Sequence, residues 1–325
     1  PLVDYSLIWI MLLRDYVREC GDLALPGELW DCVPRILESP AYQEVDGGLW
    51  SSGELRTFTD WGAVQEARFG TNAALNVFRC AALDAAAELA GLLGKDETAG
   101  EYARLRRAAT TAFEAFWSPE AGRYLARLDV ADPTATPAYH GNILALRYGL
   151  VPAERTRSVL DFILEGLERN LTFFPGHVEL YFFYYLLPML YDYGHAQVAE
   201  RVMRSHYGLM KAYGATTLVE TAERLVGGIG SYCHGWATAN MVHLTERALG
   251  VQLPVPGDPD QVLIAPDAAE LTWAAGSYPH PRGQIDVDWW LRGDRLFVRY
   301  TAPAGVTVRV EPRGSLSTHP LVVNA

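Results

Sequence analysis

Residues Asn72 to Leu93, NAALNVFRCAALDAAAELAGLL, decide the fold class of this 325-residue chain. A helix formed by this stretch is apolar and rich in alanine around most of its surface, so it must be covered on all sides. The next segment, Asp96 to Trp117 (DETAGEYARLRRAATTAFEAFW), carries Arg104, Arg106 and Arg107 on a polar face opposite one apolar stripe. A buried helix followed by an amphipathic one predicts a hairpin with one inner and one outer member.

The same alternation runs through the first 250 residues. Apolar helices are predicted at Tyr5–Cys20, Asn72–Leu93, Gly141–Tyr148 and Leu180–Tyr191, with Asp4 and Thr71 as candidate N-caps of the first two. Amphipathic helices are predicted at Leu25–Glu38, Asp96–Trp117, Pro152–Gly166 and His195–Met210, and a ninth helix at about Tyr232–Leu249 with Ser231 as its cap. We therefore expect an α/α toroid with an inner and an outer ring of helices; a layered helical bundle is the alternative.

The composition changes after Gly250. Pro254, Pro256, Gly257 and Pro259 form a linker, and five short runs of β-type alternation follow at Gln261–Ala265, Glu270–Gly276, Gln284–Leu291, Arg295–Thr301 and Val306–Val310. These runs predict a small antiparallel β-sandwich. The expected domains are residues 1–250, mostly α, and residues 251–325, mostly β.

Charge and motif content exclude several classes of protein. The net charge of -12 disfavours nucleic acid and anionic membranes as partners, and the longest apolar run, Leu180–Tyr191, is shorter than the roughly 20 residues of a membrane span. The four cysteines have no metal-ligand spacing, and neither a phosphate-binding loop nor a serine nucleophile motif occurs. The sequence predicts no cofactor and no metal.

The start of the chain bears on localisation. It lacks an initial Met and a signal-peptide pattern, so a cytoplasmic protein is the default expectation. The missing Met also indicates a truncated N-terminus, which leaves secretion open.

One cluster of residues suits carbohydrate chemistry. Thr216-Thr217-Leu218-Val219-Glu220 is followed 11 residues later by Ser231-Tyr232-Cys233-His234-Gly235-Trp236. A carboxylate can move a proton, an imidazole can bind hydroxyl groups, and an indole can stack on a pyranose ring. Without further context, an ordinary solvated loop acid is the better interpretation of Glu220.

The chain resembles the C-terminal part of bacterial α-L-rhamnosidases of the inverting, six-hairpin type. The segments that carry the resemblance are Asp4–Leu7, Phe58-Thr59-Asp60-Trp61-Gly62, Asn72–Asn76, His140–Leu146, Thr216–Glu220, Cys233–Trp236, Leu263–Pro266 and Leu271–Ala274. They span Asp4 to about Val310. The resemblance implies an (α/α)6 barrel followed by a small β-domain.

The resemblance assigns the catalytic base to Glu220. An inverting glycosidase needs a general acid as well, and the family carries its acid in an Asp-Cys-Pro-x-Arg-Glu segment that this chain lacks; Asp31-Cys32-Val33-Pro34-Arg35 has no following Glu. Nine predicted helices in place of twelve imply that the toroid is incomplete at the N-terminus and that the acid lies upstream. Asp60 is the second choice for the acid if this chain acts alone. Val219 replaces the usual Trp of the family motif, which leaves the sugar specificity open.

Seven further residues are implied as sugar ligands, and each has a purely structural alternative. Asp4 is also explained as a helix cap, Asp60 as a turn cap and Trp61 as a loop residue packed in the core. His140 and His234 are also explained as packed structural histidines, Trp236 as helix core, and Glu179 as a first-turn charge that suits the helix dipole.

The leading hypothesis is a glycoside hydrolase that cleaves terminal α-L-rhamnosides with inversion. A catalytically incomplete carbohydrate-binding or scaffold remnant of the same fold is the alternative from another class, and a six-hairpin glycosidase for another sugar is the third. Inner helices without neighbours would expose apolar surface, so we expect either upstream domains of the same polypeptide or a homo-oligomer.

Overall fold

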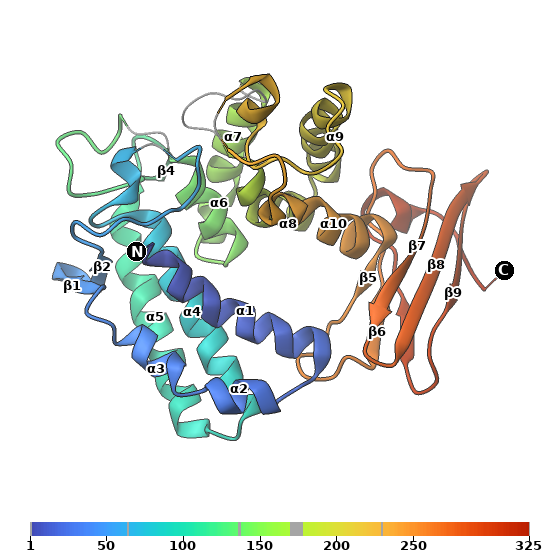
Figure 1. Cartoon of the computed structure of the whole chain (residues 1–325), viewed down its shortest axis with the longest axis horizontal. Coiled ribbons are helices and arrows are strands. Elements are labelled where there is room, and N and C mark those ends of the chain that lie inside the picture. Colours follow the sequence, from blue (N-terminus) through green and yellow to red (C-terminus); the bar gives the residue numbers. More distant parts are fainter. Residues whose placement is uncertain (1, 64, 136–137, 170–177, 229, 325) are drawn as a thin grey trace. The chain divides into compact units, whose positions relative to one another are not determined.

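The computed structural model describes residues 2–63, 65–135, 138–169, 178–228 and 230–324 (Figure 1). Its contacts divide the chain into two compact units, one formed by Pro1–Asp15 and Leu23–Tyr185 and the other by Tyr16–Asp22 and Leu186–Ala325. Two helices, α1 (Asp4–Cys20) and α8 (Phe183–Asp192), contribute residues to both units. Each unit is described separately below.

The first unit is built from helical hairpins. Helix α4 (Ala73–Leu92) is followed after a three-residue turn by α5 (Asp96–Phe113), and the two lie side by side (Figure 1). Most of α4 is buried, whereas α5 buries only Tyr102, Ala109 and Phe113. Helices α6 (Tyr139–Arg147) and α7 (Ala153–Arg169) repeat the pattern, because α6 is almost fully buried and α7 buries a single stripe. The predicted alternation of inner and outer helices is therefore present in this unit.

Buried asparagines connect the inner helices to two short β-hairpins. The Asn76 amide of α4 accepts a hydrogen bond from the Trp50 N–H at 2.8 Å and donates to the Trp50 carbonyl at 2.9 Å, on strand β2 (Leu49–Ser51), which pairs with β1 (Gln43–Val45). Asn142 of α6 does the same with Tyr124 of β4 (Arg123–Tyr124), at 3.0 and 2.7 Å; β4 pairs with β3 (Trp117–Ser118). Each amide satisfies both backbone groups of one strand residue, which fixes the hairpin against the helix.

Two local predictions in this unit are wrong. The predicted helix Leu25–Glu38 is two short helices, α2 (Ala24–Leu29) and α3 (Cys32–Leu37), because the ring of Pro34 is incompatible with a continuous helix through the Trp30 carbonyl. The N-cap of α4 is Asn72, not Thr71: its side chain accepts from the Leu75 N–H at 2.8 Å.

The second unit combines helical segments with the C-terminal β-region. Helix α9 (Ala196–Ala212) precedes η5 (Ala222–Val226), η6 (Gly235–Thr238), α10 (Ala239–His243) and the π-helical segment η7 (Leu244–Leu249). The predicted helix Tyr232–Leu249 thus starts later, at Gly235, and changes its hydrogen-bonding pattern twice.

The β-region contains two sheets. One has the order β10-β6-β5 (Thr307–Val310, Gln261–Ile264, Val251–Gln252), and the other has the order β11-β9-β8-β7 (Leu321–Val323, Arg295–Thr301, Gly283–Arg292, Trp273–His280). Inward-facing residues such as Ile285, Val287 and Trp289 form the core, and the Trp289 indole donates to the Ala248 carbonyl at 2.8 Å. Residues Gly314–Thr318 form the short helix η8.

The β-sandwich prediction is confirmed as a sandwich-like region, but the prediction that all pairs are antiparallel is wrong. β10 pairs with β6, and β11 with β9, in parallel. Both pairs join strands that are far apart in sequence, so long connections replace the tight turns that antiparallel neighbours use.

Within the described residues, none of the helices combines the length and the apolar character that crossing a membrane requires.

Candidate active-site residues and family membership

The first unit contains a loop, Thr57 to Ala63, that is held from two sides. The Asp4 carboxylate at the start of α1 accepts hydrogen bonds from the Phe58 and Thr59 N–H groups at 3.0 and 2.8 Å. Asp4 is buried, and burial raises its pKa, while these N–H donors act in the opposite direction. Asp4 therefore links the start of α1 to a loop more than fifty residues later.

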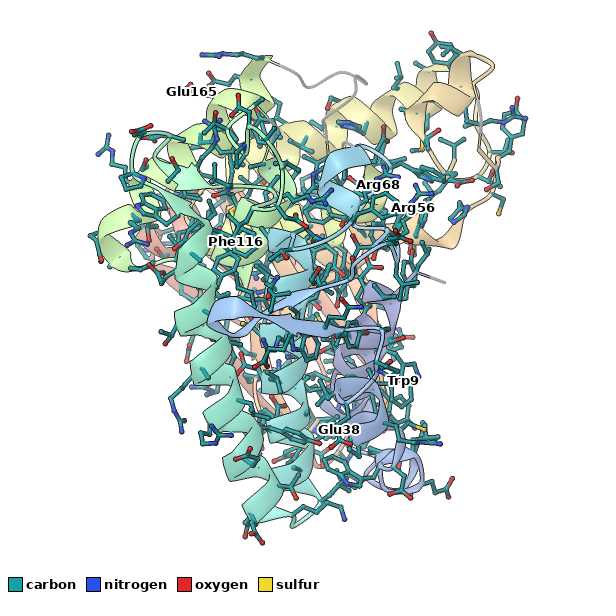
Figure 2. The ribbon with its side chains drawn as sticks, turned by 90° about the vertical axis from the view of Figure 1, so that its left-hand side faces the viewer. Trp9, Glu38, Arg56, Arg68, Phe116 and Glu165 are labelled. Atoms are coloured by element: carbon teal, nitrogen blue, oxygen red, sulfur yellow. The ribbon has the colours of Figure 1, made fainter. Side chains whose placement is uncertain are left out.

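Arg68 holds the carbonyl side of the same loop. Its Nη2 donates to the carbonyls of Asp60 at 2.6 Å and Trp61 at 2.7 Å, and its Nε donates to the Ala63 carbonyl at 3.0 Å. The guanidinium lies 5.9 Å from the centre of the Trp61 ring, and burial together with nearby Arg56 lowers the Arg68 pKa. Figure 2 shows both arginines labelled beside this loop.

The side chain of Asp60, in the middle of this loop, is buried and does not reach the surface. The side chain is fully buried; Oδ2 bonds the His140 Nε2 at 2.9 Å and accepts from the Glu179 N–H at 2.8 Å, and Oδ1 accepts from the Trp61 N–H at 2.8 Å. These partners occupy both oxygens. The arrangement favours a positioning role for Asp60 over the direct contact with sugar hydroxyls that the sequence predicts.

Trp61 is the exposed member of the group. It is 40% exposed, and its ring contacts Phe58 edge to face at 5.4 Å. His140 is buried with its ring against Phe182, and Glu179 precedes the 3-10 helix η4 (Leu180–Phe182). The first unit thus brings Asp4, Asp60, Trp61, His140 and Glu179 into one hydrogen-bonded assembly that presents an indole.

The second unit brings together the other predicted residues. Glu220 Oε2 accepts from the Ser231 N–H at 2.7 Å and the Ser231 hydroxyl at 3.0 Å, and it lies 3.4 Å from His234 Nδ1. The Trp236 indole donates to the Glu220 carbonyl at 3.2 Å, and the rings of His234 and Trp236 are 4.1 Å apart. A carboxylate, an imidazole and an indole therefore occupy one partly exposed patch.

Ser231 and Gly230 explain why the helix does not start at Tyr232. Ser231 bonds Glu220 and also His234 Nδ1, at 2.7 Å, so it orients these two side chains and caps no helix. Gly230 has φ +113°, and a Cβ at this position would lie 3.3 Å from the Cβ of Glu220. The Glu220 carboxylate is fixed by backbone that only glycine adopts easily.

The sequence does not single out Arg68, and it predicts Ser231 only as a helix cap within the Ser231–Trp236 cluster. The structure gives both residues an orienting role, because Arg68 holds three carbonyls of the Trp61 loop and Ser231 bonds the side chains of Glu220 and His234. Among the described residues no group of three or more His, Cys, Asp or Glu side chains forms a metal site.

Comparisons with known proteins identify the family. The family model for the bacterial alpha-L-rhamnosidase 6 hairpin glycosidase domain matches residues 2–247, and the model for the bacterial alpha-L-rhamnosidase C-terminal domain matches residues 250–318. A search of curated proteins gives no match. The boundary that the sequence predicts at residue 250 stays a prediction.

Solved structures agree on the fold. A GH78 family rhamnosidase of Bacillus sp. GL1 superposes with a TM-score of 0.83 at 24% identity, over 99% of this chain and 34% of that one. The alpha-L-rhamnosidases of Aspergillus terreus (TM-score 0.77, 18% identity, 94% and 36% covered) and Streptomyces avermitilis, complexed with L-rhamnose (0.72, 22%, 90% and 28%), are also similar.

The chain spans about a third of the length of these solved relatives. The matches confirm the predicted fold, a six-hairpin helical domain followed by a β-region. The chain belongs to the bacterial alpha-L-rhamnosidase family, with its six-hairpin glycosidase domain at residues 2–247 and its C-terminal domain at residues 250–318.

Proposed function

We propose that this chain is the part of an inverting α-L-rhamnosidase that supplies the catalytic base, Glu220. The observation that carries the proposal is the cluster of Glu220, Ser231, His234 and Trp236, in a chain that belongs to this family. The carboxylate would take a proton from the water that attacks the anomeric carbon of a terminal rhamnoside.

The surrounding residues fit that role. Ser231 fixes one carboxylate oxygen, and His234 and Trp236 offer an imidazole and an indole to a saccharide. Val219, which precedes Glu220 in the chain, is fully buried. The first unit, taken by itself, presents the Trp61 indole, and Asp4, Asp60, His140 and Glu179 position its loop. Glu179 and His140 would act through this loop and not through a direct sugar contact.

The test is Glu220→Gln in the protein as its gene encodes it, assayed on an aryl α-L-rhamnoside. Loss of a general base lowers kcat by about 10²–10⁴-fold. The control is Glu101→Gln, an exposed carboxylate of α5 paired with Arg104, which should leave kcat unchanged. Proton NMR of the first product should show the anomer opposite to that of the substrate.

Unchanged kcat in Glu220→Gln would remove Glu220 from the mechanism. Rhamnose binding by calorimetry without turnover in the unaltered protein would instead support the carbohydrate-binding alternative.

A further inference from the structure

A cavity of about 580 Å³ lies within the second unit and shares no residue with the Glu220 cluster. Its lining comes from the end of α8, the start of α9, η7, the loop after β6 and the segment that enters η8. Its volume is in the range of small-molecule sites.

The cavity is lined by a buried carboxylate that lacks a hydrogen-bond donor. Asp267 is 7% exposed, and among the described residues no side chain or backbone group donates a hydrogen bond to its carboxylate. Burial raises the Asp267 pKa, and the guanidinium groups of Arg247 and Arg313 act against this rise. Gly314 lies directly against the carboxylate, since a Cβ there would be 2.5 Å from Oδ1.

Two more polar atoms in the lining lack partners within the described part of the chain. The Tyr191 hydroxyl and Arg247 Nε are both buried without a hydrogen-bond partner, although Arg247 Nη2 donates to Asp192 at 2.6 Å. Unsatisfied buried polar groups are costly and uncommon in native proteins, so these two atoms, together with a carboxylate that accepts no hydrogen bond from the described residues, indicate that a molecule in the cavity completes them.

The charges in the lining select the kind of molecule that fits. Two carboxylates, Asp192 and Asp267, balance two guanidinium groups, Arg247 and Arg313, so the cavity offers no net positive charge to a phosphate or a uronate. A molecule with adjacent hydroxyl groups satisfies both signs, because each hydroxyl donates to a carboxylate and accepts from a guanidinium.

The remaining lining leaves room for a sugar ring. Gly194, Ala196, Ala268, Ala269 and Gly314 leave space beside the charged groups and present apolar surface to the C–H face of a pyranose. The Ser315 hydroxyl, also in the lining, donates to the Ala268 carbonyl at 3.0 Å.

We propose that this cavity is a second carbohydrate-binding site, for a neutral pyranose with vicinal hydroxyls, in which Asp267 accepts two hydroxyl hydrogens and Arg313 donates to their oxygens. It would hold a saccharide away from the reacting bond. The proposal does not depend on Glu220 catalysis, since its test measures binding.

The test uses calorimetry with methyl α-L-rhamnopyranoside, methyl α-D-glucopyranoside and D-glucuronate on the protein carrying Glu220→Gln, which avoids turnover. Adding Asp267→Asn should weaken one class of binding sites for the neutral sugars at least tenfold, because the amide replaces one acceptor oxygen with a donor. Adding Arg313→Gln should weaken the same class. The matched control is Arg309→Gln, an exposed arginine of β10 outside the cavity, which should change nothing.

Two readouts separate this site from the proposed active site. With Glu220 intact, Asp267→Asn should leave kcat on an aryl rhamnoside unchanged, and crystals soaked with the rhamnoside should show it against Asp267. Should Asp267→Asn fail to fold, Arg313→Gln decides, because Arg313 is exposed.

Unaltered isotherms in both variants, with no sugar density beside Asp267, would overturn the proposal. The charged groups of the lining would then be hydrogen-bonded to water and would bind no sugar. Binding of glucuronate alone would overturn the assignment to a neutral ligand.

Discussion

Replacing Arg68 with methionine tests how firmly the loop Thr57–Ala63 is held. Arg68 is 4% exposed, and its guanidinium makes three hydrogen bonds to loop carbonyls. Each bond to a charged donor contributes about 1.5 kcal/mol or more, so three contribute about 4–5 kcal/mol. Relief of the buried charge, visible in the lowered Arg68 pKa, offsets part of this and leaves a loss of about 3 kcal/mol.

Hydrogen exchange measured by mass spectrometry can detect this loss of stability at the amides of the loop itself. The amides of Thr57, Phe58 and Thr59 bond the Arg68 carbonyl and the Asp4 carboxylate, so they report on opening of the loop. A loss of about 3 kcal/mol accelerates their exchange roughly 100-fold. Arg68→Lys should give an intermediate acceleration, because the ammonium group keeps the positive charge but is one bond shorter than Nη2 and cannot replace all three hydrogen bonds.

The control is Arg104→Met on the exposed face of α5, where the ion pair with Glu101 contributes less than about 1 kcal/mol. Equal exchange rates of the loop amides in Arg68→Met and Arg104→Met would refute the conclusion that Asp4 and Arg68 hold the loop from two sides. Acceleration spread evenly over the whole first unit would refute it too, since the effect would then be global.

Asp4→Asn should lower the thermal midpoint and expose the loop to exchange, because an amide nitrogen would face one of two N–H donors and leave it unsatisfied at a cost of about 1–3 kcal/mol. Tyr42→Phe should destabilise the protein at neutral pH through loss of the bond to the Val3 carbonyl. Burial raises the pKa of Tyr42 from 10.0 to about 12, so the Tyr42 contribution is complete below pH 10 and is lost as the pH rises through 12; denaturant titrations should show the two proteins converging over that window. Gly230→Ala should reduce rhamnosidase activity and leave loop exchange in the first unit unchanged, because strain at φ +113° and contact with the Glu220 Cβ displace the carboxylate. Trp61→Ala should raise KM more than it lowers kcat if the indole stacks on the sugar, and steady-state kinetics would separate the two effects.

The pattern of helices could be predicted from the sequence because the buried face of a helix requires apolar residues at regular spacing. Helices α4 and α6 are apolar all round and α5 and α7 are not, and the structure buries them accordingly. The break between α2 and α3 is less visible, since it depends on one ring, that of Pro34, inside a convincing amphipathic pattern.

The site residues were accessible from the sequence only as separate motifs. Asp60 and His140 are eighty residues apart, and no periodicity shows that one carboxylate joins His140 to the Glu179 backbone. Arg68 leaves no pattern, because its partners are backbone carbonyls, which carry no sequence identity. Ser231 bonds the side chains of Glu220 and His234, and a serine at this position is equally typical of a helix cap. The buried Asn76 and Asn142, in contrast, belong to motifs that the sequence singled out, and the structure gives them a structural role.

Strand β11 shows that residues beyond the family match are part of the folded β-region. The family match stops at residue 318, just before β11, which covers one edge of β9 in parallel register from Leu321 to Val323. Asn324 extends that cover through bonds to Val298 and Tyr300. Ending the chain at residue 318 would remove β11, so β9 would keep only β8 as a neighbour and would expose the backbone N–H and C=O groups of its other edge. Exposed strand edges of this kind can pair with other chains and lead to aggregation.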